Sequence, residues 1–159
     1  MQVKSRHHLR SDEIRELEES LADRLGIDLD GDSYERVAFT DTDREVVLVD
    51  GEPLVASFDD DLFITVRGAN EHPPQRHVVT VDAGAISFVS DGANVMRPGI
   101  VEATDDIAPG DLVVIVEETH GKALAVGRAE ADGEEMVGDS GMVVQSLHFV
   151  GDDLYEFHV

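Results

Sequence analysis

The chain has 159 residues, of which 35 are acidic and 12 are lysine or arginine, so its formal net charge at pH 7 is −23. It has no cysteine, which excludes disulfides and thiolate metal sites. The length suffices for one domain or two small ones, and no apolar run approaches the length of a membrane helix. We therefore expect a cytoplasmic protein that makes no contact with a membrane.

The acidic residues are dispersed over patterned apolar segments and do not form a tail, which argues against disorder. Few lysines beside many carboxylates indicate a cytosol of very high salt, because at about 1 M salt the screening length falls to about 3 Å. We favour a halophilic, archaeal source. An acidic balance normally argues against nucleic-acid binding, but under such screening the global charge says little about the partner.

A helix is predicted over residues 12–25. Ser11 can cap its start, and acids follow in the first turn. Four apolar residues recur at helical spacing, namely Ile14, Leu17, Leu21 and Leu25. Gly26 is expected to end the helix.

From Tyr34 onward the apolar period changes to two, which is typical of strands. Short strands are predicted at residues 36–39, 45–49, 53–58 and 62–66, the last either a strand or the junction of a strand and a helix. Asp50-Gly51 is predicted to form a hairpin turn. The adjacent prolines of His72-Pro73-Pro74 mark a linker, and we place a domain boundary near residue 75.

The second half of the chain carries many short apolar runs separated by turns. Strands are predicted at residues 77–81, 99–103, 111–117, 123–131, 141–150 and 154–159, with a short helix over 132–136. Such closely spaced strands indicate a small closed or partly closed barrel. The fold class is therefore α+β, with a small α+β unit at residues 1–75 and a β-barrel at residues 76–159.

Residues 82–100 form the most promising site. Gly92 can adopt a positive φ, Pro98 fixes φ, and Gly99 lets another backbone approach closely. Backbone amides, the Arg97 guanidinium and the Asn94 amide can then converge on a ligand. The alternative is a barrel-closing turn with Val95 and Met96 in the core, and the residues alone favour this alternative.

Three patterns that suggest an enzyme or a metal site are incomplete. Gly138-Asp139-Ser140-Gly141 is similar to the nucleophile segment of chymotrypsin-like proteases, but Met142 replaces the next glycine. Residues 28–32 open like a calcium loop, but Ser33 stands where the loop glycine belongs. The seven histidines lack the spacing of a zinc site. We predict no catalytic residue, no metal and no cofactor.

The motifs of the second half, in their order, resemble a PUA domain, the small RNA-binding barrel of pseudouridine synthases and archaeosine transglycosylases. They are Gly84-Ala85-Ile86, Phe88-Val89, the run from Gly92 to Ile100, Pro109-Gly110-Asp111, the run from Ala123 to Ala129 and the run from Leu147 to Asp152. The resemblance implies an RNA-binding surface made of the loop after the first helix and the final strand. Its residues would be Gly92, Ala93, Asn94, Met96, Arg97 and Gly99, with His148 and Phe149 adjacent.

The order of both halves resembles the malignant-T-cell-amplified-sequence family, shared with the N-terminal part of ligatin. Residues 4–10, 48–54 and 81–100 carry this resemblance. It implies a non-enzymatic protein that binds the acceptor end of tRNA and the small ribosomal subunit, in translation initiation, re-initiation or recycling. A translation factor would be its protein partner.

The first ten residues contain three lysines and arginines, Lys4, Arg6 and Arg10, and no acid. They would supply a second contact, to phosphates of the small-subunit ribosomal RNA. A frayed, solvated terminus is the alternative. Two other functions stay open: an accessory RNA-binding subunit for a tRNA-modification enzyme, and a protein-interaction module that no longer binds RNA.

Overall fold

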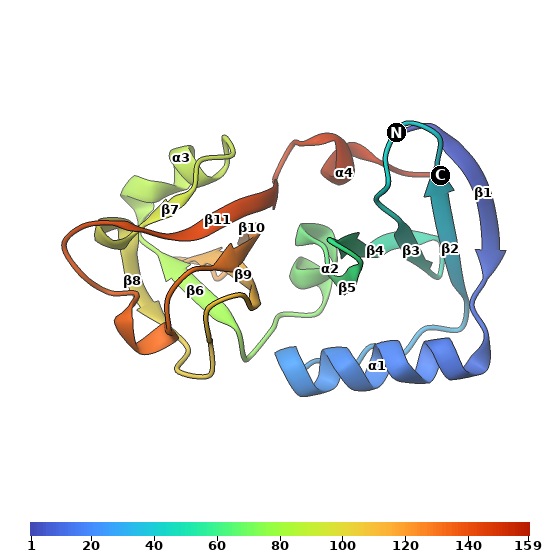
Figure 1. The fold of residues 1–159 in the computed structure, drawn as a ribbon, viewed down its shortest axis with the longest axis horizontal. Helices are drawn as coiled ribbons and strands as arrows, with labels where there is room; N and C mark the ends of the chain where they lie inside the picture. Colours follow the sequence, from blue (N-terminus) through green and yellow to red (C-terminus); the bar gives the residue numbers. More distant parts are fainter.

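The computed structural model describes residues 1–159, which form two β-sheets, one from each half of the chain. The two sheets lie side by side along the long axis of the molecule (Figure 1). The chain passes from the first sheet to the second through residues 72–77, around the adjacent prolines. Helices and strands both contribute, and the second half forms a barrel-like sheet.

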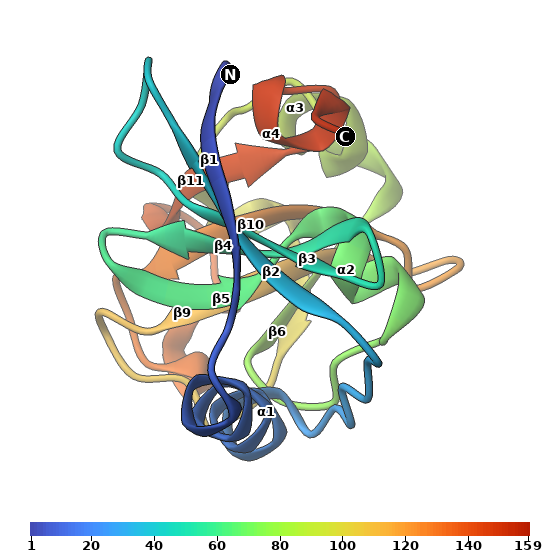
Figure 2. The same ribbon diagram turned by 90° about the vertical axis from the view of Figure 1, so that its right-hand side faces the viewer.

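The first half is an antiparallel sheet with strands in chain order. Its elements are β1 (Val3–His8), α1 (Ser11–Leu25), β2 (Tyr34–Phe39), β3 (Val46–Val49), β4 (Glu52–Phe58), β5 (Asp61–Ile64) and α2 (Val66–Glu71). Helix α1 buries Leu17, Leu21 and Leu25. Figure 2 views this half end on, with β1 crossing the front of the molecule.

Most local signals in this half are confirmed. Gly26 ends α1 with φ 69°, and Asp50 and Gly51 both have positive φ, as the predicted hairpin turn requires. The helix begins one residue earlier than expected, with Arg10 at the N-cap and its amide donating to Glu13 at 3.0 Å. Residues 3–8 pair with β2, so the first ten residues are not frayed.

The second half forms a six-stranded sheet in the order β7-β11-β10-β9-β6-β8. Its strands are β6 (Val78–Val81), β7 (Val95–Met96), β8 (Ile100–Ala103), β9 (Leu112–Glu117), β10 (Ala123–Ala129) and β11 (Met142–Phe149). Its short helical segments are η1 (Ala83–Ala85), α3 (Ile86–Val89), η2 (Arg97–Gly99), η3 (Gly133–Glu135) and α4 (Asp153–Glu156). Only η2 separates the two edge strands β7 and β8 in the chain, so the edges lie close together and the sheet is nearly closed.

The predicted final strand at residues 154–159 is wrong, because this segment begins as helix α4. The Asp152 carboxylate accepts from the Tyr155 amide at 2.8 Å and caps the helix. Leu154 and Phe157, three residues apart, then bury their side chains against the first half of the molecule. The Phe157 and Phe39 rings meet edge to face at 5.0 Å between centroids.

Strand β9 holds the two halves together. Leu112, Val114 and Val116 belong to a cluster of 28 buried residues that also contains the core of the first sheet. The intervening Val113 and Ile115 belong to the second cluster, inside the barrel. Because neighbouring side chains of a strand face opposite ways, one fully apolar strand contributes to both cores.

No helix has the length and apolar character that crossing a membrane demands.

Candidate nucleic-acid interface

A surface pocket of about 340 Å³ opens between α3 and η2, at the end of the molecule that lies away from the first sheet (Figure 1). It is lined by Asp82, Gly84, Ala85, Phe88, Val89, Asn94, Val95, Met96, Pro98 and Gly99. Most of these residues belong to the predicted site segment. The structure therefore brings residues 82–99 together around one hollow.

Glycine and a capping aspartate shape the pocket wall. The Asp82 carboxylate accepts from the Ala85 amide at 3.0 Å and starts η1. A Cβ added at Gly99 would lie 3.0 Å from the Ala85 Cβ, so the neighbour that approaches this glycine is a side chain and not the backbone that was predicted. Gly92 has φ +93°, the positive φ that was predicted for it.

Two large apolar side chains stand exposed at this pocket. Phe88 is 67% exposed and Met96 is 49% exposed. The neighbouring Val89 and Val95 are buried, so the alternative that put both Val95 and Met96 in the core holds for Val95 alone. We call this pocket, together with the exposed side chains of Phe88 and Met96, the α3–β7 face.

Phe88 was not among the predicted site residues. The signal was present in the short helix itself, because Ile86 and Val89 are three residues apart and pack toward the barrel. A four-residue helix with that inner pair must turn Phe88 outward. An aromatic side chain on the outer side of so short a helix is a feature that packing does not explain.

The Arg97 side chain is hydrogen-bonded to the loop of residues 135–141. Its Nε donates to the Glu135 carbonyl at 2.8 Å and its Nη1 to the Ser140 carbonyl at 3.0 Å. The Arg97 amide also donates to the Gly141 carbonyl at 2.9 Å. Two of the three guanidinium nitrogens are thus engaged in holding residues 135–141.

The loop between α3 and β7 is tied down on both sides. The Ala93 amide donates to the Phe88 carbonyl at 3.0 Å. The Asn94 side-chain oxygen accepts from the Ser146 amide at 2.9 Å and fixes the loop to β11. Ala93 and Asn94 remain exposed, so they lie on the predicted surface in a fixed conformation.

His148 is not on the predicted surface. Its side chain is 0% exposed, its Nε2 accepts from the Val66 amide at 3.1 Å, and its Nδ1 lies 2.9 Å from Asp152. The ring is therefore neutral, with its proton on Nδ1, and it connects β11 to the start of α2. Both nitrogens are engaged, so His148 cannot contact RNA in this conformation.

Asp152 completes this buried connection. Burial raises the pKa of its carboxyl, but the hydrogen bonds from His148 and from the Tyr155 and Phe149 amides outweigh burial, and the net shift of the pKa is downward. The carboxylate is therefore held in its charged form. It fixes the imidazole and caps α4 at the same time.

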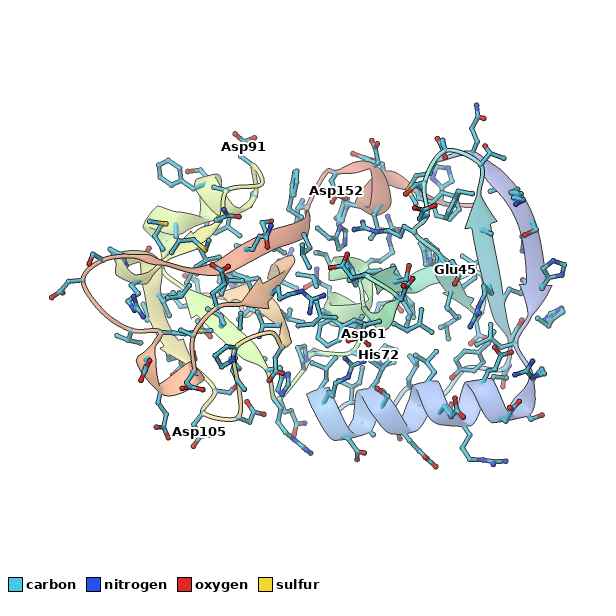
Figure 3. All side chains as sticks on the ribbon, in the orientation of Figure 1. Glu45, Asp61, His72, Asp91, Asp105 and Asp152 are labelled. Atoms are coloured by element: carbon cyan, nitrogen blue, oxygen red, sulfur yellow. The ribbon has the colours of Figure 1, made fainter.

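Phe149 is half-buried and lies between the α3–β7 loop and the seam of the two sheets. Its ring packs on Gly92, where an added Cβ would lie 2.8 Å from a ring carbon. Figure 3 shows Asp91, at the tip of this loop, and Asp152 along the same edge of the molecule. Phe149 thus lies beside the loop of the α3–β7 face and is only partly buried.

The basic residues of the N-terminus lie at the other end of the molecule, on β1 and at the start of α1 (Figure 1). Arg6 pairs with Glu35 at 3.0 Å, and Arg10 pairs with Asp12 at 3.2 Å. Lys4 is exposed and forms no ion pair. The structure does not bring these residues together with the α3–β7 face.

Comparison with known proteins identifies the second half of the chain. The family model for the PUA domain matches residues 77–150. An uncharacterized protein of Methanocaldococcus jannaschii is 34% identical over 99% of this chain and 99% of its own length.

Solved structures agree with this match. A conserved PUA domain protein from Thermoplasma acidophilum is 32% identical and superposes with a TM-score of 0.83, over 95% of this chain and 97% of that one. A hypothetical protein from Pyrococcus horikoshii is 28% identical, also with a TM-score of 0.83, over 96% of this chain and 98% of that one.

A named relative is translation machinery-associated protein 20 of Saccharomyces cerevisiae. It is 36% identical over 70% of this chain, and the match covers 65% of the yeast protein. The malignant T-cell-amplified sequence 1 homolog of Drosophila melanogaster is 34% identical over 58% of this chain and 53% of its own length. The aligned region thus spans less than two thirds of each of these two relatives.

Proposed function

Since the chain belongs to the family of PUA-domain proteins, we propose that it is a non-enzymatic RNA-binding protein that assists translation in the cytoplasm. Its similarity to translation machinery-associated protein 20 and to malignant T-cell-amplified sequence 1 supports the association with translation. The similarity to archaeal proteins over the whole chain, together with the net charge of −23, supports an archaeal and halophilic source.

The α3–β7 face is the observation that carries this proposal. Phe88 and Met96 expose apolar surface beside a pocket lined mainly by small and apolar groups. An exposed aromatic ring can stack on an unpaired base, and the stacking contact itself involves no phosphate. Such contacts suit a protein whose surface carries few cations, because they do not require neutralised phosphates.

We further propose that the RNA is the acceptor end of tRNA, presented at the small ribosomal subunit. The pocket of about 340 Å³ suits a single unstacked base and not the groove of a duplex. Sequence-specific RNA recognition uses single-stranded ends and loops, and the 3′ end of tRNA is such an end.

The contacting residues are proposed to be Phe88 together with the part of the predicted set that is exposed or only partly buried. That part consists of Gly92, Ala93, Asn94, Met96, Arg97, Gly99 and Phe149. Lys4 is the N-terminal base with no ion pair, so it is the best placed of the three to reach ribosomal RNA phosphates. Residues 1–75 and 76–159 act as two packed units in this proposal.

RNA crosslinking with sequencing, in cells grown in their natural salt, tests the proposal. We expect reads concentrated on tRNA 3′ ends and on small-subunit RNA. Reads confined to a few tRNA species would favour an accessory role in tRNA modification. A read distribution equal to background would contradict RNA binding and leave a protein-interaction module.

A further inference from the structure

A second depression of about 560 Å³ lies at the seam between the two halves. The loop after β2 forms one wall, and the end of β11 with the start of α4 forms the other. The lining residues are Met1, Asp41, Thr42, Arg44, Phe149, Asp152, Asp153 and Leu154. Nothing in the α3–β7 face accounts for this hollow.

Arg44 is the unusual residue in this depression. It is half-buried, with its guanidinium 4.8 Å from the centroid of the buried Phe58 ring. Its side chain forms no ion pair and no hydrogen bond with the protein. Among the arginines this is true only of Arg44 and of Arg15, and Arg15 is exposed on α1. The other arginines all donate to a carboxylate or a carbonyl.

Three of the carboxylates around Arg44 have other partners. Asp41 pairs with the Met1 ammonium at 3.3 Å, and Asp59 pairs with Arg128 at 3.3 Å. Asp152 is engaged with His148 at 2.9 Å. Burial lowers the pKa of Arg44, and the more distant charges of Asp152 and Asp59 offset this only in part. Arg44 is thus a partly desolvated cation that packs on the Phe58 ring and has no direct counter-charge, so an anion can still bind to it.

Phe149 links the Arg44 depression to the loop of the α3–β7 face. Phe149 lines the depression and packs its ring on Gly92 of the α3–β7 loop. An RNA strand that runs from the pocket beside Phe88 toward Arg44 would pass Phe149 on its way. An aromatic ring followed by a cation is the sequence of contacts that single-stranded nucleic acid needs.

We propose that Arg44 binds a backbone phosphate of the RNA whose unpaired end lies on the α3–β7 face. This inference rests on the proposed function and adds to it a contact from the first half of the molecule. A guanidinium presents paired N–H donors that match phosphate oxygens. The exposed carboxylates of Asp43, Asp60 and Asp153 repel phosphate, and concentrated salt screens this repulsion more than it weakens a partly buried contact.

The salt dependence of RNA binding tests the contact. The probe is a labelled RNA hairpin with a single-stranded 3′ extension, titrated at several KCl concentrations over which circular dichroism shows each protein folded. Arg44→Gln is expected to weaken binding about tenfold, and to make the slope of log K against log salt shallower by about 0.7, the share of one phosphate on a single strand. Arg44→Lys should keep the slope and lose part of the affinity.

The matched control is Arg15→Gln, the same substitution at the other arginine without a protein partner. Arg15 belongs to α1, which runs along the side of the molecule opposite α3 and α4 (Figure 1), so Arg15→Gln should leave affinity and slope unchanged. Neutral methylphosphonates placed one at a time along the 3′ extension give a second measurement. One position should weaken binding to the wild type and have no effect on Arg44→Gln.

The outcomes separate the two proposals. If Arg44→Gln matches Arg15→Gln in affinity and slope and no methylphosphonate discriminates between them, the Arg44 contact is refuted, while RNA binding by the α3–β7 face stands. If the wild type does not bind the hairpin at all, both proposals fail. If inorganic phosphate displaces RNA from the wild type while every methylphosphonate is tolerated, Arg44 holds a free anion, and the RNA contact is refuted.

Discussion

Strand β11 passes through two regions of opposite character. At its start, Met142 pairs with Met96 of β7 and both side chains are exposed, so apolar atoms face water. Near its end, His148 is fully buried with Asp152 as its partner, so polar atoms lie in the interior. Exposed apolar groups and buried polar groups are the two departures from ordinary packing that need an explanation.

Because of this contrast, substitutions that act on stability can be separated from substitutions that act on binding. The buried pair connects β11 to α2 and to α4, so a change there should act on folding. The exposed pair makes no comparable contacts, so a change there should act on the ligand. Six substitutions, taken from the largest expected effect to the smallest, test this distinction between stability and binding.

The largest effect is expected for His148→Ala. The substitution leaves the Val66 amide without an acceptor and the Asp152 carboxylate without its imidazole, and it opens a cavity. We expect the free energy of unfolding to fall by about 2–4 kcal/mol, measured by urea denaturation at constant high salt. Gln145→Ala, at an exposed position of the same strand, is the control and should change stability by less than about 0.5 kcal/mol. Equal midpoints for the two variants would refute the structural role of His148.

Phe88→Ala should weaken binding of a hairpin with a 3′ extension by about 1–3 kcal/mol, the usual contribution of one base stacked on an aromatic ring. The urea midpoint should not change, because Phe88 is 67% exposed. Val3→Ala removes a comparably exposed apolar side chain from β1 and should leave affinity unchanged. Affinity that survives Phe88→Ala would remove the α3–β7 face from the RNA contact.

Asp152→Asn should give a pH-dependent loss of stability. The folded-state pKa of Asp152 lies below its ordinary value of 3.8, so its stabilising contribution is present above the unfolded-state pKa and is lost as the pH falls through the folded-state pKa. The variant should therefore be less stable than the wild type near pH 7, by about 1–2 kcal/mol. The gap should close below about pH 4, in urea titrations over that range. A gap independent of pH would contradict the charged state of Asp152.

Arg97→Ala should loosen residues 135–141 by removing the donors to the Glu135 and Ser140 carbonyls. We expect a loss of about 1 kcal/mol in stability and faster amide exchange confined to this loop. RNA affinity should fall only severalfold. A complete loss of RNA binding with unchanged exchange in the loop would show that Arg97 acts mainly through its RNA contact and not by holding residues 135–141.

The smallest effects are expected at β1. Arg6→Gln breaks an exposed ion pair with Glu35 and should change stability by less than about 1 kcal/mol. Lys4→Gln should leave hairpin binding unchanged and reduce co-sedimentation with small ribosomal subunits. If Lys4→Gln instead weakens hairpin binding as much as Phe88→Ala does, the two ends of the molecule contact the same RNA.

Elements set by local physics were predictable from the sequence. The apolar spacing of α1, the stop at Gly26 and the turn at Asp50-Gly51 depend on neighbouring residues, and the structure contains all three. The apolar run of β9 was predicted as a strand, although its double role in two cores was not. Strand alternation turns Leu112 and Val113 to opposite faces of β9. Each face is buried in a core of its own only because one sheet packs against the other.

The elements that were missed depend on distant partners. The predicted strand at residues 154–159 is overridden because Leu154, inside α4, and Phe157, directly after it, pack on the first half of the molecule. His148 can be buried because its Nε2 accepts a hydrogen bond from the Val66 amide, which lies 82 residues earlier in the chain. Arg97 binds carbonyls about 40 residues later, so its sequence neighbours give no sign that it is engaged.

The most direct test of the central claim is to follow backbone amide signals by nuclear magnetic resonance while the RNA hairpin is added, which a 17.3 kDa protein permits. The account predicts that the perturbed signals cluster in residues 84–99, with a second group around Arg44 and Phe149, while β1 stays unchanged. Perturbation centred on β1, or spread evenly over the surface, would contradict the claim that the α3–β7 face binds RNA.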